Sequence, residues 1–166
     1  CSDCDAGRYA SDVGAAQCLL CATGRVQGAT GQADCVACLA GTFQNRTGQL
    51  ACTNCEIGRA AAASGSSECL LCGVGEAQPD SGQDACVQCE VGKFKSGAGT
   101  AACTNCTTGT YASSLGTAAC LSCEKGRVQP NTGDSDCVDC AAGTYQEAAG
   151  ELACTTCEIG RAVASE

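Results

Sequence analysis

The apolar positions of the chain recur every 17 residues and follow no helical period. All five aromatic residues occupy one slot in this spacing, two residues after a glycine, and the other repeats hold Val or Ala there. Stretches such as GTFQ at 41–44 and GRVQ at 24–27 suit a short extended segment between turns. We therefore predict short β segments and turns with little or no helix, and aromatic rings that pack on disulfides or glycines. The five residues are Tyr9, Phe43, Phe94, Tyr111 and Tyr145.

The cysteines follow the same spacing. Each repeat reads C-x-x-C-x-x-G-x6-G-x3, nine times, and a tenth repeat is incomplete. Such self-similarity is typical of a linear array, or solenoid, in which each repeat contacts mainly its neighbours. Because the sequence starts on a cysteine and stops within a repeat, we expect a segment of a longer chain. The predicted fold class is a small disulfide-rich, elongated linear array over residues 1–166, with repeats that begin at residues 1, 18, 35, 52, 69, 86, 103, 120, 137 and 154.

A slower pattern accompanies the 17-residue spacing. The residue after the first cysteine of a repeat is Ser or Thr, then Leu, then Val, and this order returns every 51 residues. Two interpretations remain open. The pattern is a record of duplication, or it is geometric, with every third repeat facing the same way in a twisted rod that has three edges.

Composition argues against an ordinary hydrophobic core. Leu, Ile, Val and Phe make up 22 of 166 residues, whereas 20 residues are cysteine. So few large apolar residues do not offset the conformational entropy of a chain without cross-links. The formal charge of −9, with no run of Lys or Arg, weighs against nucleic acid and anionic membranes as partners. No apolar stretch is long enough to span a bilayer, so we expect no direct membrane insertion of this segment.

Pairs of the form Cys-x-x-Cys can serve as disulfides, zinc ligands or redox centres. A four-thiolate zinc site would use two adjacent pairs and impose a 34-residue period. The 51-residue pattern disfavours that period, although an echo at 102 residues, between 52–60 and 154–162, weakens this point. A redox centre needs one pair on a β-α-β frame rather than ten pairs in an array. We expect disulfides, and neither a cofactor nor a metal.

The disulfides have two regular connectivities. One joins the second cysteine of each pair to the first cysteine of the next pair, which leaves Cys1 and Cys157 to partners outside the chain. The other joins like cysteines across two repeats and again imposes the disfavoured 34-residue period. In the first, each bond closes a loop of about 15 residues, worth roughly 3 kcal/mol in the chain-entropy model. Its bonds are Cys4–Cys18, Cys21–Cys35, Cys38–Cys52, Cys55–Cys69, Cys72–Cys86, Cys89–Cys103, Cys106–Cys120, Cys123–Cys137 and Cys140–Cys154.

The stretch CDAGRYASDVGAAQC at residues 4–18 has a family resemblance. It resembles the ephrin-receptor-like cysteine-rich tandem repeat, and is similar to the simplest modules of tumour necrosis factor receptors. The resemblance covers essentially the whole chain, and long runs of this repeat look like those in large extracellular proteins of algae and other protists. It implies an extracellular or cell-surface array of disulfide-closed modules, with the first of the two pairings and with no catalytic residues.

The sequence gives no sign of an active site. An enzyme needs convergent polar groups, whereas this chain has no His and its carboxylates share a slot in only half of the repeats. We expect those carboxylates to form a solvated acidic edge rather than a calcium array. They are Asp5, Glu56, Glu90, Glu124 and Glu158.

Two functions remain as hypotheses. The strict repeat length favours a structural extracellular rod or filament that associates with itself or with other extracellular structural proteins. The alternative is the ligand-binding or adhesion ectodomain of a cell-surface receptor. Two sequons, NRT at Asn45 and NCT at Asn105, are possible N-glycan sites, with Asn105 less accessible beside a bonded cysteine.

Overall fold

The computed structural model describes residues 2–99 and 101–159, which its contacts divide into two compact units. The first unit is Cys1–Cys72 with Gln78–Val87, and the second is Gly73–Ala77 with Gln88–Glu166. Cys1, the last residues from 160 onward and residue 100 lie outside the described residues. Each unit is built from the same 17-residue repeats, and a single continuous array over the whole chain remains a prediction.

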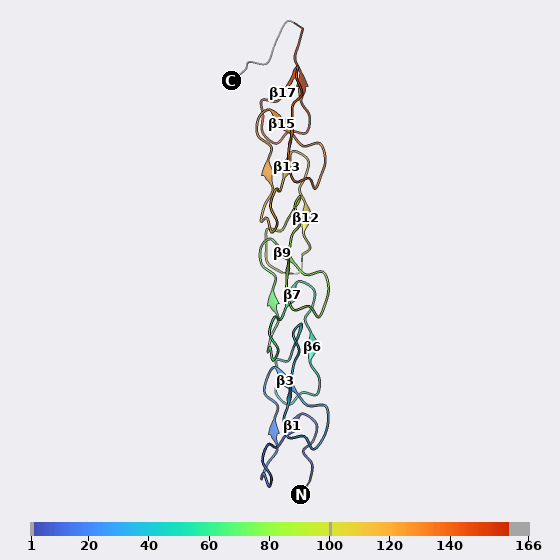
Figure 1. Cartoon of the computed structure of the whole chain (residues 1–166), viewed down its shortest axis with the longest axis vertical. Helices are drawn as coiled ribbons and strands as arrows, with labels where there is room; N and C mark the ends of the chain where they lie inside the picture. The colour runs from blue at the N-terminus through green and yellow to red at the C-terminus, as the bar shows by residue number, and fades with distance from the viewer. Residues whose placement is uncertain (1, 100, 160–166) are drawn as a thin grey trace. The chain divides into compact units, whose positions relative to one another are not determined.

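Every strand is two residues long, and the described residues contain no helix (Figure 1). Eight strand pairs are antiparallel, with Arg8 opposite Leu20 and Tyr9 opposite Leu19 in the first of them. These short pairs confirm the predicted small disulfide-rich fold. The strands are β1 (Arg8–Tyr9), β2 (Leu19–Leu20), β3 (Arg25–Val26), β4 (Val36–Ala37), β5 (Thr42–Phe43), β6 (Thr53–Asn54), β7 (Arg59–Ala60), β8 (Leu70–Leu71), β9 (Glu76–Ala77), β10 (Val87–Gln88), β11 (Lys93–Phe94), β12 (Thr104–Asn105), β13 (Thr110–Tyr111), β14 (Leu121–Ser122), β15 (Arg127–Val128), β16 (Val138–Asp139), β17 (Thr144–Tyr145) and β18 (Thr155–Thr156).

A glycine turn leads into the first strand of a pair. The Arg8 N–H donates to the carbonyl oxygen of Asp5 at 3.1 Å, and Gly7, the third residue of this turn, has a φ of 82°. A positive φ at the third position of a four-residue turn is strained for a residue with a side chain. The first glycine of the repeat therefore fixes where the strand begins.

Backbone hydrogen bonds join each repeat to the next. The Gly24 N–H donates to the carbonyl oxygen of Gln44 at 2.7 Å, and the Cys38 N–H donates to the carbonyl oxygen of Gly24 at 2.8 Å. A third bond, at 2.8 Å, runs from the Gly48 N–H to the carbonyl oxygen of Cys21. Equivalent bonds recur within both compact units. Neighbouring repeats thus satisfy one another's backbone groups, as expected for a solenoid.

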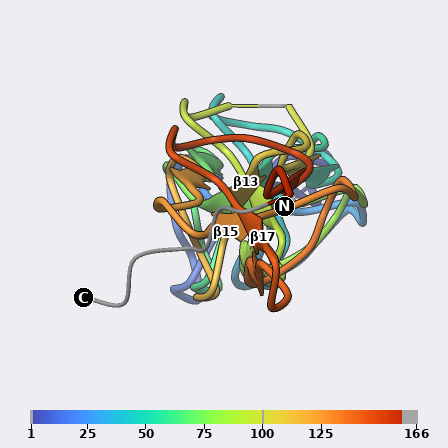
Figure 2. The same ribbon diagram turned by 90° about the horizontal axis from the view of Figure 1, so that it is seen from above.

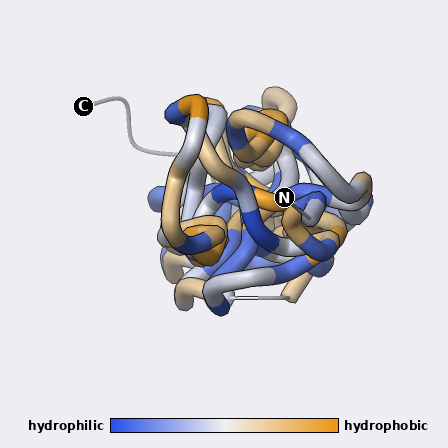
Figure 3. Tube along the Cα trace, turned by 90° about the horizontal axis from the view of Figure 1, so that it is seen from below, coloured by the Kyte–Doolittle hydropathy of each residue, from blue (hydrophilic) through white to orange (hydrophobic). Residues whose placement is uncertain are grey.

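The core consists mainly of cystine sulfur and small side chains. The second cysteine of a repeat is almost fully buried at Cys21, Cys55 and Cys106. Phe43 packs against a buried cluster of Cys55, Ala61 and Cys69, which confirms for this ring the expected packing on a disulfide. Figure 3 shows apolar segments on outer loops as well as near the middle of the view.

The loops of successive repeats do not stack in one column. In the first compact unit, drawn from blue to green, they project in several directions when seen from above (Figure 2). This is compatible with the geometric interpretation of the 51-residue pattern. The rotation from one repeat to the next stays a prediction.

Candidate interaction surface

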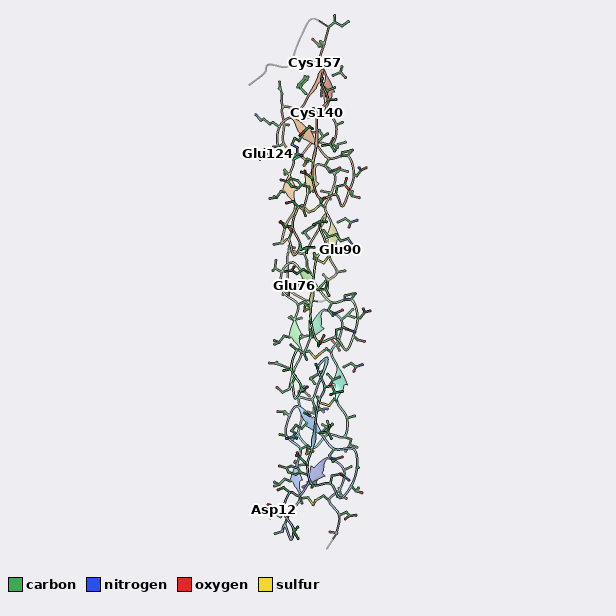
Figure 4. All side chains as sticks on the ribbon, in the orientation of Figure 1. Asp12, Glu76, Glu90, Glu124, Cys140 and Cys157 are labelled. Atoms are coloured by element: carbon green, nitrogen blue, oxygen red, sulfur yellow. A yellow bond between two sulfur atoms is a disulfide. The ribbon has the colours of Figure 1, made fainter. Side chains whose placement is uncertain are left out.

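Each of the nine complete repeats is closed by one disulfide, and the bonds join the pairs that the 17-residue spacing favours. The Cα atoms of each pair lie 5.6–5.8 Å apart, and Figure 4 draws the bonds in yellow. Cys157 is a free thiol within the described residues. Because the other described sulfurs are bonded to each other, they are not thiolates available to zinc. In the same part of the chain, no group of three His, Cys, Asp or Glu side chains is placed to hold a metal.

In many repeats a glutamine side chain braces the long loop, which means that it forms hydrogen bonds with two backbone groups of that loop. The sequence analysis did not predict this role. The Gln44 amide nitrogen donates to the carbonyl oxygen of Ala51 at 2.9 Å, and its amide oxygen accepts from the Arg46 N–H at 3.1 Å. The side chain is buried, so both halves of its amide replace the hydrogen bonds that water would make. The sequence feature that could have revealed this role is the recurrence of glutamine at one position, three residues after the first glycine of the repeat. This position holds Gln27, Gln44, Gln78, Gln129 and Gln146, all with the same two bonds.

Lys95 takes the glutamine slot in one repeat. Its side chain is 4 % exposed, and its ammonium nitrogen lies 2.6 Å from the carbonyl oxygen of Glu76 and 2.9 Å from that of Gly99. A third carbonyl oxygen, of Gly73, lies at 3.4 Å. A buried ammonium needs such partners because its desolvation is costly. In the repeats that carry Gln or Lys there, the side chain in this slot thus donates hydrogen bonds to backbone carbonyls.

The residue after the first cysteine points outward in the six repeats where it is apolar. These side chains are between 54 % and 68 % exposed, although they belong to strands. On β2 and β8 both leucines of the strand are exposed. Each of these repeats therefore exposes an apolar side chain at the same place in its own strand pair. The six residues are Leu19, Val36, Leu70, Val87, Leu121 and Val138.

Charged side chains pair at the surface rather than at a site. Arg127 contacts Asp136 at 3.2 Å and Asp139 at 2.8 Å. The hydrogen bond from Arg127, helped by the Cys137 N–H, lowers the pKa of Asp136 below its usual value. The hydrogen bond and charge of Lys93 likewise lower the pKa of Glu90. Such exposed pairs contribute little to stability.

The carboxylates of the shared acidic slot are exposed, as expected of solvated groups. Within the second compact unit, however, Glu90 and Glu124 lie on opposite sides of the view in Figure 4. Their exposure agrees with solvated carboxylates, and the acidic edge stays a prediction.

The two sequons differ in their surroundings. Asn45 is exposed in the long loop that Gln44 braces. Asn105, on β12, is also exposed, but its carboxamide carbon lies 3.1 Å from the place where a Cβ of Gly133 would sit. A glycan on Asn105 would require the side chain to move away from Gly133, which belongs to the next repeat.

The fold and its cystines define a class, the tandem cysteine-rich repeat proteins of extracellular type. The family model described as tyrosine-protein kinase ephrin type A/B receptor-like matches residues 24–67, 92–133 and 126–164. Because these matches cover more than half of the chain, the chain belongs to that family, whose repeats are typically non-catalytic. A comparison with curated proteins finds no match. Within the described residues, the structure has no helix that is long and apolar enough to cross a membrane.

Proposed function

We propose that this chain is a structural segment of an extracellular protein: an elongated, non-catalytic shaft that associates with copies of itself. The observation that carries the proposal is the uniform joint between repeats. The same backbone bonds and one disulfide recur from repeat to repeat. Uniform joints of this kind build length and resist proteolysis, and they place no set of polar groups around a substrate.

The exposed Leu and Val side chains of the strand pairs support self-association. A half-exposed Leu or Val gains about 1–2 kcal/mol at most when it is covered, so a stable contact needs several repeats at once. A second copy presents the same positions at the same 17-residue spacing. Lateral contact between copies can therefore engage, at the same time, those repeats that face the same way.

The test is the oligomeric state of the oxidised chain as a function of salt. Each copy carries a charge of −9, so copies repel one another at low ionic strength. We expect sedimentation velocity to show assembly that grows with salt, and negative-stain electron microscopy to show filaments or bundles. A chain that stays monomeric at every salt and protein concentration would contradict the structural proposal.

The second candidate function is a ligand-binding or adhesion ectodomain. It is favoured by one irregular repeat, in which Lys95 replaces the bracing glutamine and Gly99 has a φ of 119°. Irregular repeats are where binding residues are expected in an otherwise uniform array. A monomeric chain that binds a cell surface, and loses binding in a Lys95→Gln variant, would support this function over the first.

The proposal includes an N-glycan on Asn45, because this residue is exposed in the long loop. Secretion from a eukaryotic host should give a mass loss on glycosidase treatment that disappears in Asn45→Gln and persists in Asn105→Gln. The reverse result would place the glycan on Asn105.

A further inference from the structure

In several repeats an arginine on the first strand of a pair reaches the cysteine that closes the same disulfide loop. Arg59, on β7, donates from its Nη1 to the carbonyl oxygen of Cys69 at 2.8 Å. Cys69 is bonded to Cys55, so the guanidinium lies beside this cystine. The arginine stands one residue after the first glycine of its repeat, and the same contact joins Arg25 to Cys35 and Arg127 to Cys137.

The burial of the loop-closing cysteine follows this contact. Cys35, Cys69 and Cys137, which receive it, are 4–5 % exposed. Where another residue holds the arginine position, the loop-closing cysteine is partly exposed, and we call such a loop uncovered. The loop-closing cysteines of the uncovered loops are Cys52, Cys86, Cys103, Cys120 and Cys154.

The side chains that replace the arginine make bonds within their own turn instead. The Thr42 hydroxyl donates to the carbonyl oxygen of Leu39 at 2.7 Å, and Lys93 pairs with Glu90 at 2.8 Å. Both partners come before the first strand of the pair. These side chains therefore point away from the cysteine that closes the loop.

Arg8 shows that the contact alone does not bury the cysteine. Its guanidinium donates to the carbonyl oxygen of Cys18 at 3.1 Å, but Arg8 is itself exposed and Cys18 is partly exposed. An arginine thus covers the disulfide only where it packs against the loop, as the half-buried Arg25, Arg59 and Arg127 do.

We propose that the uncovered loops are sites of thiol–disulfide exchange with low-molecular-weight thiols such as glutathione, and that an arginine packed on a loop protects it. A thiolate must reach a sulfur to attack it, and exposed disulfides are the labile or regulatory ones. The loop-closing cysteine is the accessible one, because its partner is buried, as at Cys38 and Cys106. The inference concerns single loops and holds whether or not the chain self-associates.

The exchange at one uncovered loop can be written in full. At Cys38–Cys52 the thiolate attacks the sulfur of Cys52, and the bond to Cys38 breaks. The electron pair of that bond leaves on the Cys38 sulfur, which takes a proton from water. A second thiol molecule attacks the mixed disulfide, releases the Cys52 thiol and forms the oxidised small disulfide. The loop thus gains two electrons and two protons from two thiol molecules.

The charge of the arginine acts against its covering effect, because a guanidinium attracts an anionic thiolate. Asp34 lies 3.1 Å from Arg25, and Asp136 lies 3.2 Å from Arg127, so these two charges are offset. Arg59 makes no ion pair among the described residues. Substitution of Arg59 therefore separates the two effects, since loss of attraction slows exchange at Cys69 and loss of cover speeds it.

The direct test is a timed reaction of the oxidised full chain with reduced glutathione under native conditions, followed by acid quenching and mass spectrometry of peptic peptides. We expect the uncovered Cys38–Cys52 and Cys106–Cys120 bonds to open about tenfold faster than their covered neighbours, a change equivalent to one hydrogen bond. Glutathione should be found on Cys52 rather than Cys38. Equal rates, or faster opening of the covered loops, would overturn the proposal. The covered neighbours are Cys55–Cys69 and Cys123–Cys137.

A pair of exchanged residues tests the role of the arginine. Arg59→Thr copies the residue of the preceding repeat and should speed the opening of Cys55–Cys69 about tenfold, whereas Thr42→Arg should slow the opening of Cys38–Cys52. The matched control, Arg46→Thr, removes the same charge from an exposed residue and should leave both rates unchanged. Slower or unchanged opening in Arg59→Thr would overturn the protective role.

Hydrogen exchange distinguishes cover from local opening of the loop. The Cys72 N–H donates to the carbonyl oxygen of Gly58, and the Gly82 N–H donates to that of Cys55, so both amides report on this loop. In Arg59→Thr they should keep their exchange rates while the reaction with glutathione speeds up. Acceleration of both by the same factor would show that the arginine only holds the loop closed, and would overturn the proposal.

A further variant serves if Arg59→Thr does not fold. Arg127→Thr uncovers the Cys123–Cys137 loop in the second compact unit, with the Cys140 N–H, which donates to the carbonyl oxygen of Gly126, as the reporter of opening. Faster reaction with glutathione at an unchanged exchange rate of this amide supports the proposal, and an unchanged reaction rate counts against it.

Discussion

Gly24 and Gly65 meet across two repeats, where a side chain has no room. A Cβ on Gly24 would lie 1.9 Å from the carbonyl oxygen of Gly65, whereas a Cβ on Gly65 would meet only the Ala37 side chain, at 3.9 Å. Both glycines have a positive φ, 77° and 79°. The two positions therefore separate the effect of backbone conformation from that of close packing.

We predict that Gly24→Ala destabilises the chain more than Gly65→Ala. The second change introduces only the positive-φ strain, about 1–2 kcal/mol. Gly24→Ala adds a clash between the new Cβ and the carbonyl oxygen of Gly65. This backbone cannot move away without separating the two glycine turns. Thermal unfolding of both variants should give the lower midpoint for Gly24→Ala, and equal midpoints would show that the close approach is absent in solution.

Acid should weaken one surface ion pair. The pKa of Asp136 is lowered in the folded chain, mainly by Arg127, so the ionised carboxylate favours the folded state. This contribution is complete above the unfolded value of about 3.9 and is lost as the pH falls through the lower folded value. Asp136→Asn should therefore cost a small amount of stability at pH 6 and none near pH 2.

The control for this prediction is Glu56→Gln, because Glu56 makes no ion pair among the described residues. The stability change caused by Asp136→Asn should vary more between the two pH values than the change caused by Glu56→Gln. A pH-independent difference for Asp136→Asn would contradict the assigned pairing.

At the scale of elements, each turn, two-residue strand and disulfide loop forms a module whose backbone hydrogen bonds are completed by the adjacent repeats. Cys55 shows this connection, since its N–H donates to the carbonyl oxygen of Gly41 and its C=O accepts from the Gly82 N–H. Its sulfur is bonded to Cys69. Loss of one loop should therefore be felt in the adjacent repeats and fade beyond them.

We predict that a Cys55→Ser, Cys69→Ser double variant loses amide protection locally. The missing loop constraint is worth about 3 kcal/mol. Hydrogen exchange should accelerate at Gly82 and leave Gly133, in the second compact unit, unchanged. The matched control is Ser67→Ala, on the exposed side of the same loop. Uniform acceleration along the chain would instead indicate one cooperative folding unit.

The sequence predicted these elements better than it predicted their contacts. The spacing of cysteine and glycine led to the turns, the short strands and the absence of helix, because glycine conformation and loop closure are local properties. The buried Gln44 escaped prediction, since a polar side chain is usually exposed and its two partners lie within its own loop. The exposed Leu19 and Leu70 were unexpected for the opposite reason, because large apolar residues usually mark a core.

At the scale of the whole molecule, cross-links take the place of a hydrophobic core. The largest fully buried side chains are seven cysteines and Gln129. In a chain with 22 large aliphatic or Phe residues, many of them exposed, apolar burial alone does not offset chain entropy. The reduced chain should accordingly lose its fold, and this dependence suits an extracellular, oxidising environment.

Peptide mapping of the unreduced protein tests the central claim, that every complete repeat is closed by one disulfide. Proteolysis followed by mass spectrometry should recover Cys21 linked to Cys35 and Cys106 linked to Cys120, with the same offset in the other repeats. Links between like cysteines, such as Cys21 with Cys38, would contradict it. Free thiols that hold stoichiometric zinc would contradict it equally.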